Sequence, residues 1–167
     1  MITLILDGYN VIYAIPSLAK ELDRSLEAAR TALIRLCEAY RARRGDLGQV
    51  YVVFDGRGDG EAGAHGRQGG VTVVFTHKPE EADQRILRVI EAERGRGPCV
   101  VVSNDNEVAN NARAFGARIV SAQEFYRAAG QVTTPGRQPP ADPGKATPSA
   151  RDAQRITEEY RKHLEGR

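Results

Sequence analysis

The sequence predicts an α/β fold in which a central, mainly parallel sheet is covered by helices on both faces, giving three layers. Short apolar runs that lack polar alternation recur along the chain, which is typical of strands buried on both sides. Between most of these runs lie segments whose apolar residues recur every three or four positions, the spacing of an amphipathic helix. Strands that alternate with helices in this order form parallel sheets. The 167 residues suffice for one such domain with an appendage.

Three of the predicted helices also carry a start signal. Pro79 stands at the favoured first-turn position of one helix. Asn104 and Glu107 have the spacing of a capping box, and Ser121 and Glu124 repeat that spacing before the last helix. We therefore expect strands at residues 2–6, 50–54, 71–75, 99–102 and 117–120, and helices at residues 26–40, 80–93, 104–115 and 121–130.

Two stretches depart from this alternation. Seven of the 16 residues from 55 to 70 are Gly, so we expect a mobile loop there, of the kind that often serves as a lid or binding loop. Residues 131–150 hold five of the eight prolines, which predicts an extended linker after a domain at residues 1–130. Residues 151–167 are predicted to form a charged helix with a narrow apolar stripe. That stripe could dock on the domain, bind a partner or pair with its own copy as a homodimer.

Composition and charge narrow the class of protein. Hydrophobic residues make up 41% of the chain and charged residues 28%, as in globular proteins. The net charge of +2 permits a nucleic-acid partner without indicating one. Cys37 and Cys99 lie in apolar segments and form no C-x-x-C motif, so we expect buried free thiols in a reducing compartment. No apolar stretch approaches the roughly 18 residues that span a membrane, and no basic region precedes the first apolar run. A cytoplasmic protein without a membrane partner is expected.

Four aspartates fall at equivalent places in the predicted architecture. Asp7, Asp55 and Asp105 each follow a predicted strand, and Asp83 lies in the first turns of a predicted helix. Each of them alone is explained by turn or helix-start preferences. However, the carboxyl ends of parallel strands share one edge of the sheet, where ligands bind in open α/β folds. The sequence therefore predicts that Asp7 and Asp105 face one crevice and that Asp83 reaches it.

Carboxylates gathered in one crevice repel each other unless a cation is present. Their hard oxygen ligands suit Mg²⁺ or Mn²⁺, and such ions activate water for attack on phosphodiesters. Asn10, one turn after Asp7, could hold a metal-bound water or a phosphate oxygen. Other catalytic signatures are missing from the sequence, including a P-loop, a dinucleotide-binding fingerprint and a G-x-S-x-G nucleophile motif. The three histidines are scattered and suggest no ligand cluster.

Four runs together resemble a known family. They are Leu6-Asp7-Gly8-Tyr9-Asn10-Val11-Ile12, Val52-Val53-Phe54-Asp55-Gly56, Val71-Thr72-Val73-Val74-Phe75-Thr76 followed by Glu81-Ala82-Asp83, and Val101-Val102-Ser103-Asn104-Asp105. In order and spacing, over about residues 1–130, they resemble the YacP-like branch of the NYN domains in the PIN-like nuclease group. The resemblance implies a metal-dependent endoribonuclease associated with ribosomes and translated mRNA. By position it makes Asp7, Asp83 and Asp105 the metal-site acids and Asn10 their polar partner.

The sequence also departs from that family pattern. The branch tends to carry a second acid one turn after Asp83, where this chain has Leu87. It also tends to have Thr-Ser-Asp where this chain has Ser103-Asn104-Asp105. The missing acid argues against a two-metal mechanism, whereas one metal held by three Asp remains workable.

Two functions are consistent with these residues. In the first, a metal-dependent endoribonuclease, Asp7 and Asp105 hold the ion, Asp83 holds it or orients the attacking water, and Asn10 positions a ligand. Candidate substrate contacts are Tyr9, Arg57, Lys78 and Arg85. The alternative is a weakly catalytic or non-catalytic module that binds RNA or the ribosome with a partly degraded acid site. Leu87 and the absence of a strong basic patch motivate this second interpretation.

Overall fold

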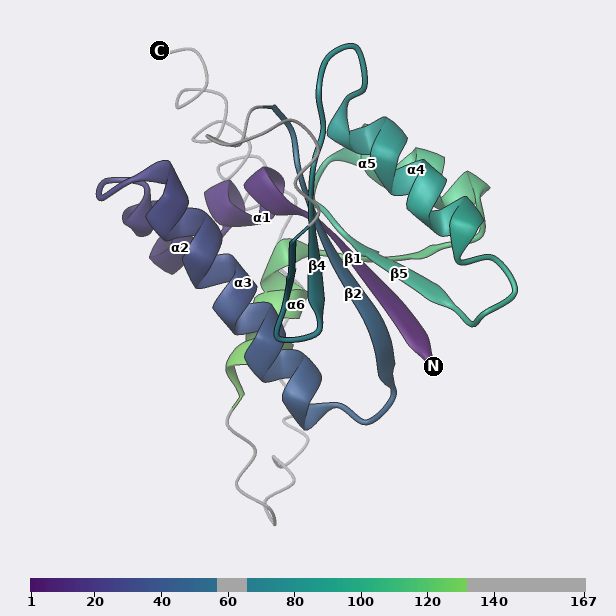
Figure 1. Ribbon diagram of the computed structural model, residues 1–167, viewed down its shortest axis with the longest axis horizontal. Helices are drawn as coiled ribbons and strands as arrows, with labels where there is room; N and C mark the ends of the chain where they lie inside the picture. The colour runs from purple at the N-terminus through teal and green to yellow at the C-terminus, as the bar shows by residue number, and fades with distance from the viewer. Residues whose placement is uncertain (57–65, 132–167) are drawn as a thin grey trace, which may run out of the picture. The chain divides into compact units, whose positions relative to one another are not determined.

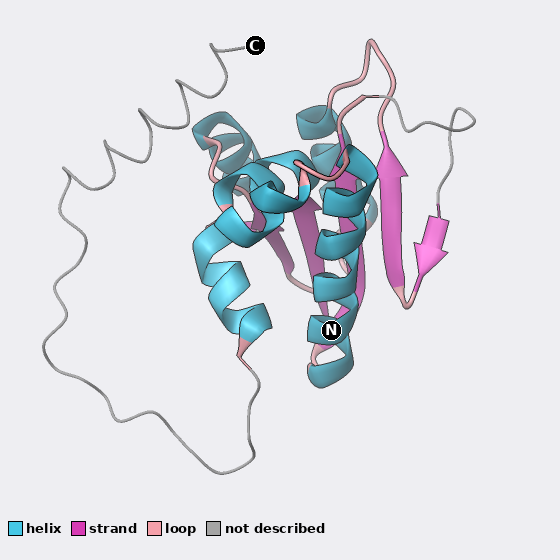
Figure 2. Ribbon diagram, turned by 90° about the vertical axis from the view of Figure 1, so that its left-hand side faces the viewer, coloured by secondary structure: helices cyan, strands magenta, loops and turns pink. Residues whose placement is uncertain are grey.

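A six-stranded sheet forms the centre of the domain in the computed structural model, which describes residues 1–56 and 66–131 (Figure 1). The strand order is β3-β4-β2-β1-β5-β6. Every neighbouring pair is parallel except β3 and β4, and Figure 2 shows β3 running opposite to β4 at the edge of the sheet. The strands are β1 (Ile2–Asp7), β2 (Leu47–Phe54), β3 (Gly66–Gln68), β4 (Val71–Phe75), β5 (Cys99–Val102) and β6 (Arg118–Val120).

Helices cover both faces of this sheet, so the domain has the three layers that the sequence predicts (Figure 1). Successive side chains of a strand point to opposite faces. Accordingly, Leu6 of β1 packs in the core under one helical layer, and its neighbour Ile5 packs in the core under the other. The first layer contains α1 (Gly8–Ala14), α2 (Pro16–Glu21), α3 (Leu26–Arg43) and α6 (Ala122–Gly130), and the second contains α4 (Ala82–Ala92) and α5 (Asn106–Ala114).

The predicted strands and long helices are confirmed, but three short elements were not predicted. These are α1, α2 and β3. Helices of about two turns give too few apolar repeats to show a period, and their stability comes from packing rather than from local sequence. The short strand β3 arises within the Gly-rich stretch 55–70, where a loop without strands was expected. The expected mobility of residues 57–65, the linker at residues 132–150 and the terminal helix at residues 151–167 lie outside the described residues.

Helix starts are also corrected in detail. Pro79 precedes α4 rather than forming its first turn, because Glu81 and Gln84 make the capping box that begins the helix at Ala82. Asp105, and not Asn104, caps α5. By contrast, the predicted capping box before α6 is present. Within the residues described, no helix is both long enough and apolar enough to cross a bilayer. Both cysteines are buried and free, as expected.

A buried carboxylate fixes the end of α4 to the sheet. Glu93 accepts hydrogen bonds from the hydroxyls of Tyr51 at 3.1 Å and Thr3 at 3.4 Å. It also pairs with the guanidinium of Arg96 at 3.5 Å. Burial, followed by the nearby Glu93 carboxylate, raises the pKa of Tyr51, which keeps its hydroxyl a donor. This cluster lies in β1, β2 and the α4–β5 turn and joins the central strands to the second helical layer.

Glu93→Ala should therefore lower the free energy of unfolding by about 2 kcal/mol, since two hydroxyls lose their acceptor. Urea denaturation of the variant measures this change. Glu91→Ala removes an exposed carboxylate from the same helix and should leave stability within about 0.5 kcal/mol of the parent chain. Equal stability of the two variants would show that Glu93 is not a structural acceptor.

Candidate active site at the carboxyl edge of the sheet

Asp7 lies at the centre of the carboxyl edge of the sheet. It is the last residue of β1, the strand that runs between β2 and β5, and it precedes α1 without a side-chain hydrogen bond to that helix. Its Oδ2 accepts a hydrogen bond of 3.1 Å from the hydroxyl of Ser103, which is buried directly after β5. The same hydroxyl accepts a 3.1 Å bond from the backbone N–H of Asp105. Ser103 thus ties Asp7 to the turn that carries Asp105.

Two further contacts hold that turn in place. Asp105 Oδ1 accepts from the backbone N–H groups of Glu107 at 2.8 Å and Val108 at 3.3 Å, which fixes the carboxylate at the start of α5. The side-chain carbonyl of Asn10 accepts a 2.8 Å bond from the backbone N–H of Asn104. Asn10, predicted to hold a ligand, therefore has its oxygen engaged by the turn, and its amide N–H₂ is the group left to meet a ligand.

Asn104 has a structural role that the sequence did not indicate. Its side-chain oxygen accepts from the backbone N–H of Ala122 at 2.9 Å, and its amide donates to Gln123 at 3.0 Å. These bonds attach the β5–α5 turn to the start of α6. Because the Asn104 side chain is used there, Asp105 is the residue that caps α5.

The other two acids approach from β2 and α4. Asp55 directly follows β2, and its Oδ1 accepts a 3.1 Å bond from the hydroxyl of the buried Thr76. Asp83 lies in the first turn of α4, where its Oδ1 accepts from the backbone N–H of Gln84 at 2.8 Å. Ser103 and Thr76 were not predicted as parts of the site. The only sequence signal for Ser103 or Thr76 was that each is a hydroxyl residue directly after a predicted strand.

The pKa of Asp7 responds to the charges of the other three aspartates. The pKa of Asp7 is raised from 3.8 to about 6, and burial is the largest cause. The charges of Asp105, Asp55 and Asp83 contribute to this rise, and the Ser103 hydrogen bond opposes it. All four aspartates thus lie near enough to interact, as their places in the sequence suggest. Among residues 1–56 and 66–131, no salt bridge joins Asp7 to a basic side chain.

The donor set suits a hard cation only in part. Among residues 1–56 and 66–131, no three Asp, Glu, His or Cys side chains form a group that could hold a metal ion. Asp7, Asp83 and Asp105, predicted as three ligands of one ion, thus do not form a closed set. Each nevertheless uses a single carboxylate oxygen for the hydrogen bonds described above. Mg²⁺ keeps several waters and commonly needs only one or two carboxylates. Asp7 and Asp105, joined through Ser103, fit that requirement.

The predicted substrate contacts differ in their surroundings. Tyr9 is half-buried, and its ring packs against the ring of Phe54 at the end of β2, with 4.9 Å between the ring centroids. Arg85 forms a salt bridge of 3.5 Å with Glu80, so its charge is already paired. Lys78 is exposed between β4 and α4. Arg57 lies outside the described residues.

Comparison with known proteins places this chain in a family. The family model for the YacP-like NYN domain matches residues 4–166. The chain belongs to the YacP-like NYN domain family. The match extends past residue 130, beyond the part of the chain that carried the resemblance. NYN domains have a PIN-like nuclease fold, and membership indicates a nuclease-type function related to RNA.

Individual relatives agree with this assignment. The uncharacterized protein YacP of Bacillus subtilis (strain 168) is 37% identical over 92 residues, 53% of this chain. The chain spans about half the length of that relative (51%). A crystal structure of a variant of Rae1 (YacP) from Bacillus subtilis superimposes with a TM-score of 0.66 at 33% identity, covering 78% of this chain and 76% of that chain. A second crystal structure of Rae1 (YacP) gives a TM-score of 0.64 at 26% identity, covering 99% and 86%.

Leu87, the main departure from the pattern of the family, is accounted for by packing. It is half-buried and lies against the core under α4 and α5. The position one turn after Asp83 therefore contributes apolar contact here instead of a carboxylate.

Thr76→Val tests how the site holds Asp55. The substitution keeps the shape of the buried side chain but removes the donor to Asp55, which should lower the free energy of unfolding by about 1 kcal/mol. A double-mutant cycle with Asp55→Asn, followed by urea denaturation, measures the coupling between the two residues. Strictly additive effects would show that this hydrogen bond contributes no stability.

Proposed function

We propose that the chain is an endoribonuclease that hydrolyses RNA phosphodiester bonds and depends on Mg²⁺ or Mn²⁺. The observation that carries this proposal is the shared electrostatic environment of four aspartates around Asp7 at the carboxyl edge of the sheet. Carboxylates gathered at one edge of the sheet, with no salt bridge to any of the four among the described residues, favour a cation. Membership of the YacP-like NYN family supports a nuclease.

Each residue has a role that follows from its position. Asp7 and Asp105 would hold the ion through the oxygens that Ser103 and the start of α5 leave available. Asp83, at the start of α4, would orient the attacking water and accept its proton. The Asn10 amide would donate to a phosphate oxygen. When bound, Mg²⁺ or Mn²⁺ supplies Lewis-acid stabilisation of phosphate charge and lowers the pKa of water.

Cleavage of a mixed-sequence single-stranded RNA tests the proposal. The full chain should cleave with Mn²⁺ and not with EDTA, and Asp7→Asn should reduce the rate by at least about 100-fold. Asp23→Asn, a change at an exposed acid between α2 and α3, should leave the rate unchanged. Mn²⁺ should also raise the Tm of the parent chain and not that of Asp7→Asn, because an ion bound only to the folded state stabilises it. Full activity of Asp7→Asn would refute the proposal.

A second candidate is a module that binds RNA or the ribosome without efficient hydrolysis. Leu87 and the lack of a closed three-ligand group in the described part of the chain favour it. Such a module should bind RNA equally well after Asp83→Asn and should show no rise in Tm with Mn²⁺. If purified RNA is not cleaved, the same assay on translating ribosomes distinguishes this module from a nuclease that acts on ribosome-associated mRNA.

A further inference from the structure

One buried arginine has no hydrogen-bond acceptor or ion pair among residues 1–56 and 66–131. Arg30, in the second turn of α3, is only 9% exposed. Its Nε makes no hydrogen bond, and within residues 1–56 and 66–131 the structure gives its guanidinium no ion pair. Buried charges are almost always paired, because an unpaired one is costly to remove from water. An arginine kept in this state therefore calls for a ligand.

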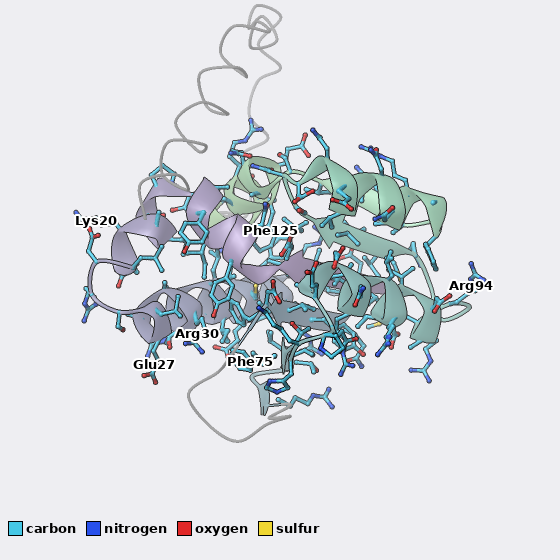
Figure 3. All side chains as sticks on the ribbon, turned by 90° about the horizontal axis from the view of Figure 1, so that it is seen from above. Lys20, Glu27, Arg30, Phe75, Arg94 and Phe125 are labelled. Carbon is cyan, nitrogen blue, oxygen red and sulfur yellow. The ribbon has the colours of Figure 1, made fainter. Side chains whose placement is uncertain are left out.

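The guanidinium lies at the edge of the sheet that carries the aspartates. Its Cζ is 5.3 Å from the centroid of the Phe75 ring, a cation–π contact with the last residue of β4 (Figure 3). The next residue, Thr76, is the one that donates to Asp55. Arg30 thus lies beside the end of β4, next to the residue that binds Asp55.

A row of aromatic rings links Arg30 to the centre of the site. The ring of Phe75 stacks on that of Phe54 with 5.5 Å between centroids, and Phe54 in turn contacts Tyr9 at 4.9 Å. Tyr9 is separated from Asp7 by a single residue. The packed rings therefore fix the position of Arg30 relative to Asp7.

We propose that Arg30 is a phosphate-binding residue for the RNA strand, contacting a backbone phosphate next to the bond at the acid site. This inference rests on the proposed function. A guanidinium offers a planar set of N–H donors that matches phosphate in a bidentate manner. The Phe75 ring lies against the guanidinium, with 5.3 Å between Cζ and the ring centroid, and provides no hydrogen-bond acceptor in the plane of its N–H groups. Burial strengthens each such hydrogen bond. The positive charge also offsets the repulsion between RNA and the four aspartates.

Arg30 is better suited to this role than the arginine that the sequence suggested. Arg85 is already paired with Glu80, at 3.5 Å. A phosphate would have to displace that carboxylate, whereas Arg30 has no carboxylate to displace in the described part of the chain.

Binding of a short single-stranded RNA of mixed sequence tests the inference. The measurement uses the full chain with Asp7→Asn and Mg²⁺, so that the RNA stays intact. Arg30→Met should weaken binding roughly tenfold, the loss expected for one charged hydrogen-bonded contact. The slope of log affinity against log salt concentration should become shallower by about 0.7, the value for one phosphate contact on a single strand. Met keeps an unbranched stem against Phe75, and circular dichroism and Tm confirm folding.

Two matched variants make the result specific. Arg35→Met removes the same charge from an exposed position on the same helix and should change neither affinity nor slope. Arg30→Lys keeps the charge without the bidentate geometry, so it should retain the salt slope and lose part of the affinity. It also provides the test if Arg30→Met does not fold. If the Arg30 variants bind RNA as well as Arg35→Met does, the inference about Arg30 is wrong, but the proposed function is unaffected. If the parent chain does not bind RNA at any salt concentration, both the inference and the proposed function are wrong.

Discussion

Asp7→Asn is expected to stabilise the folded domain by up to about 3 kcal/mol at pH 7 while it abolishes RNA cleavage. Burial and three neighbouring carboxylates hold the pKa of Asp7 at about 6, so ionising this group opposes folding at neutral pH. A shift of about two pH units corresponds to about 3 kcal/mol. Asn removes the charge and can still accept the hydrogen bond from Ser103. We therefore expect that the parent chain is less stable because Asp7 is ionised, and that the same ionised carboxylate is needed for its activity.

The raised pKa of Asp7 determines how the free energy of unfolding should change with pH. The pKa of Asp7 is about 6 in the folded chain and 3.8 as the ordinary value, so the folded state binds the extra proton between these values. The free energy of unfolding of the parent chain should therefore fall, through this group, as the pH rises from about 4 to about 6. Asp7→Asn lacks this dependence. Urea denaturation of both chains at pH 4, 5, 6 and 7 should show a difference that is small at pH 4 and complete at pH 7.

Asp23→Asn provides the control, because it removes an exposed acid and should leave the pH dependence of the parent chain in place. A difference between Asp7→Asn and the parent chain that is the same at every pH would not be due to ionisation of Asp7. An Asp7→Asn chain that is less stable than the parent at pH 7 would contradict the prediction outright.

The fold and the gathering of acids could be predicted because both depend on topology. Parallel strands bring their carboxyl ends to one edge, so the residues after strands meet whatever the details of packing. Asp7 and Asp105 follow β1 and β5, which are neighbours in the sheet. Runs that are apolar on both faces of a strand are also strong sequence signals, which is why β1, β4 and β5 coincide closely with the predicted strands. β2 ends as predicted but begins earlier, at Leu47.

The fine structure of the site could not be predicted, because it depends on which partner each polar group finds. Asn104 and Asp105 are equally good caps in isolation. The choice of Asp105 follows from the contacts of Asn104 with Asn10 and with the start of α6. Arg30 shows the same limit more strongly. In the sequence it is an arginine within an amphipathic helix. Only the structure shows that it packs against Phe75 and that its Nε is buried without an acceptor in the described part of the chain.

Gly8→Ala is expected to destabilise the domain by about 2–3 kcal/mol and to disturb the site at the same time. Gly8 is buried at the start of α1, directly after Asp7. A Cβ there would lie 2.5 Å from two atoms of the Phe54 ring and 3.0 Å from the backbone oxygen of Val53. Insertion of a methyl group into a packed core typically costs 1–3 kcal/mol. We place this case at the upper end because Phe54 is fully buried between Tyr9 and Phe75 and has no space into which to move.

Gly8→Ala should also lower activity, because Gly8 lies in the same segment as Asp7 and Asn10. Relief of the clash requires α1 to move away from β2, and this movement would carry Asp7 and Asn10 away from the turn that bears Asp105. Urea denaturation measures the loss of stability, with Gly45→Ala as the control, since a Cβ at that exposed glycine meets nothing within 4 Å. Adding Phe54→Leu to Gly8→Ala should restore part of the loss, because the shorter side chain vacates the position of the ring. Gly8→Ala with parental stability would mean that the Phe54 ring yields freely. The aromatic row that we expect to fix Arg30 relative to Asp7 would then be less rigid than its packing indicates.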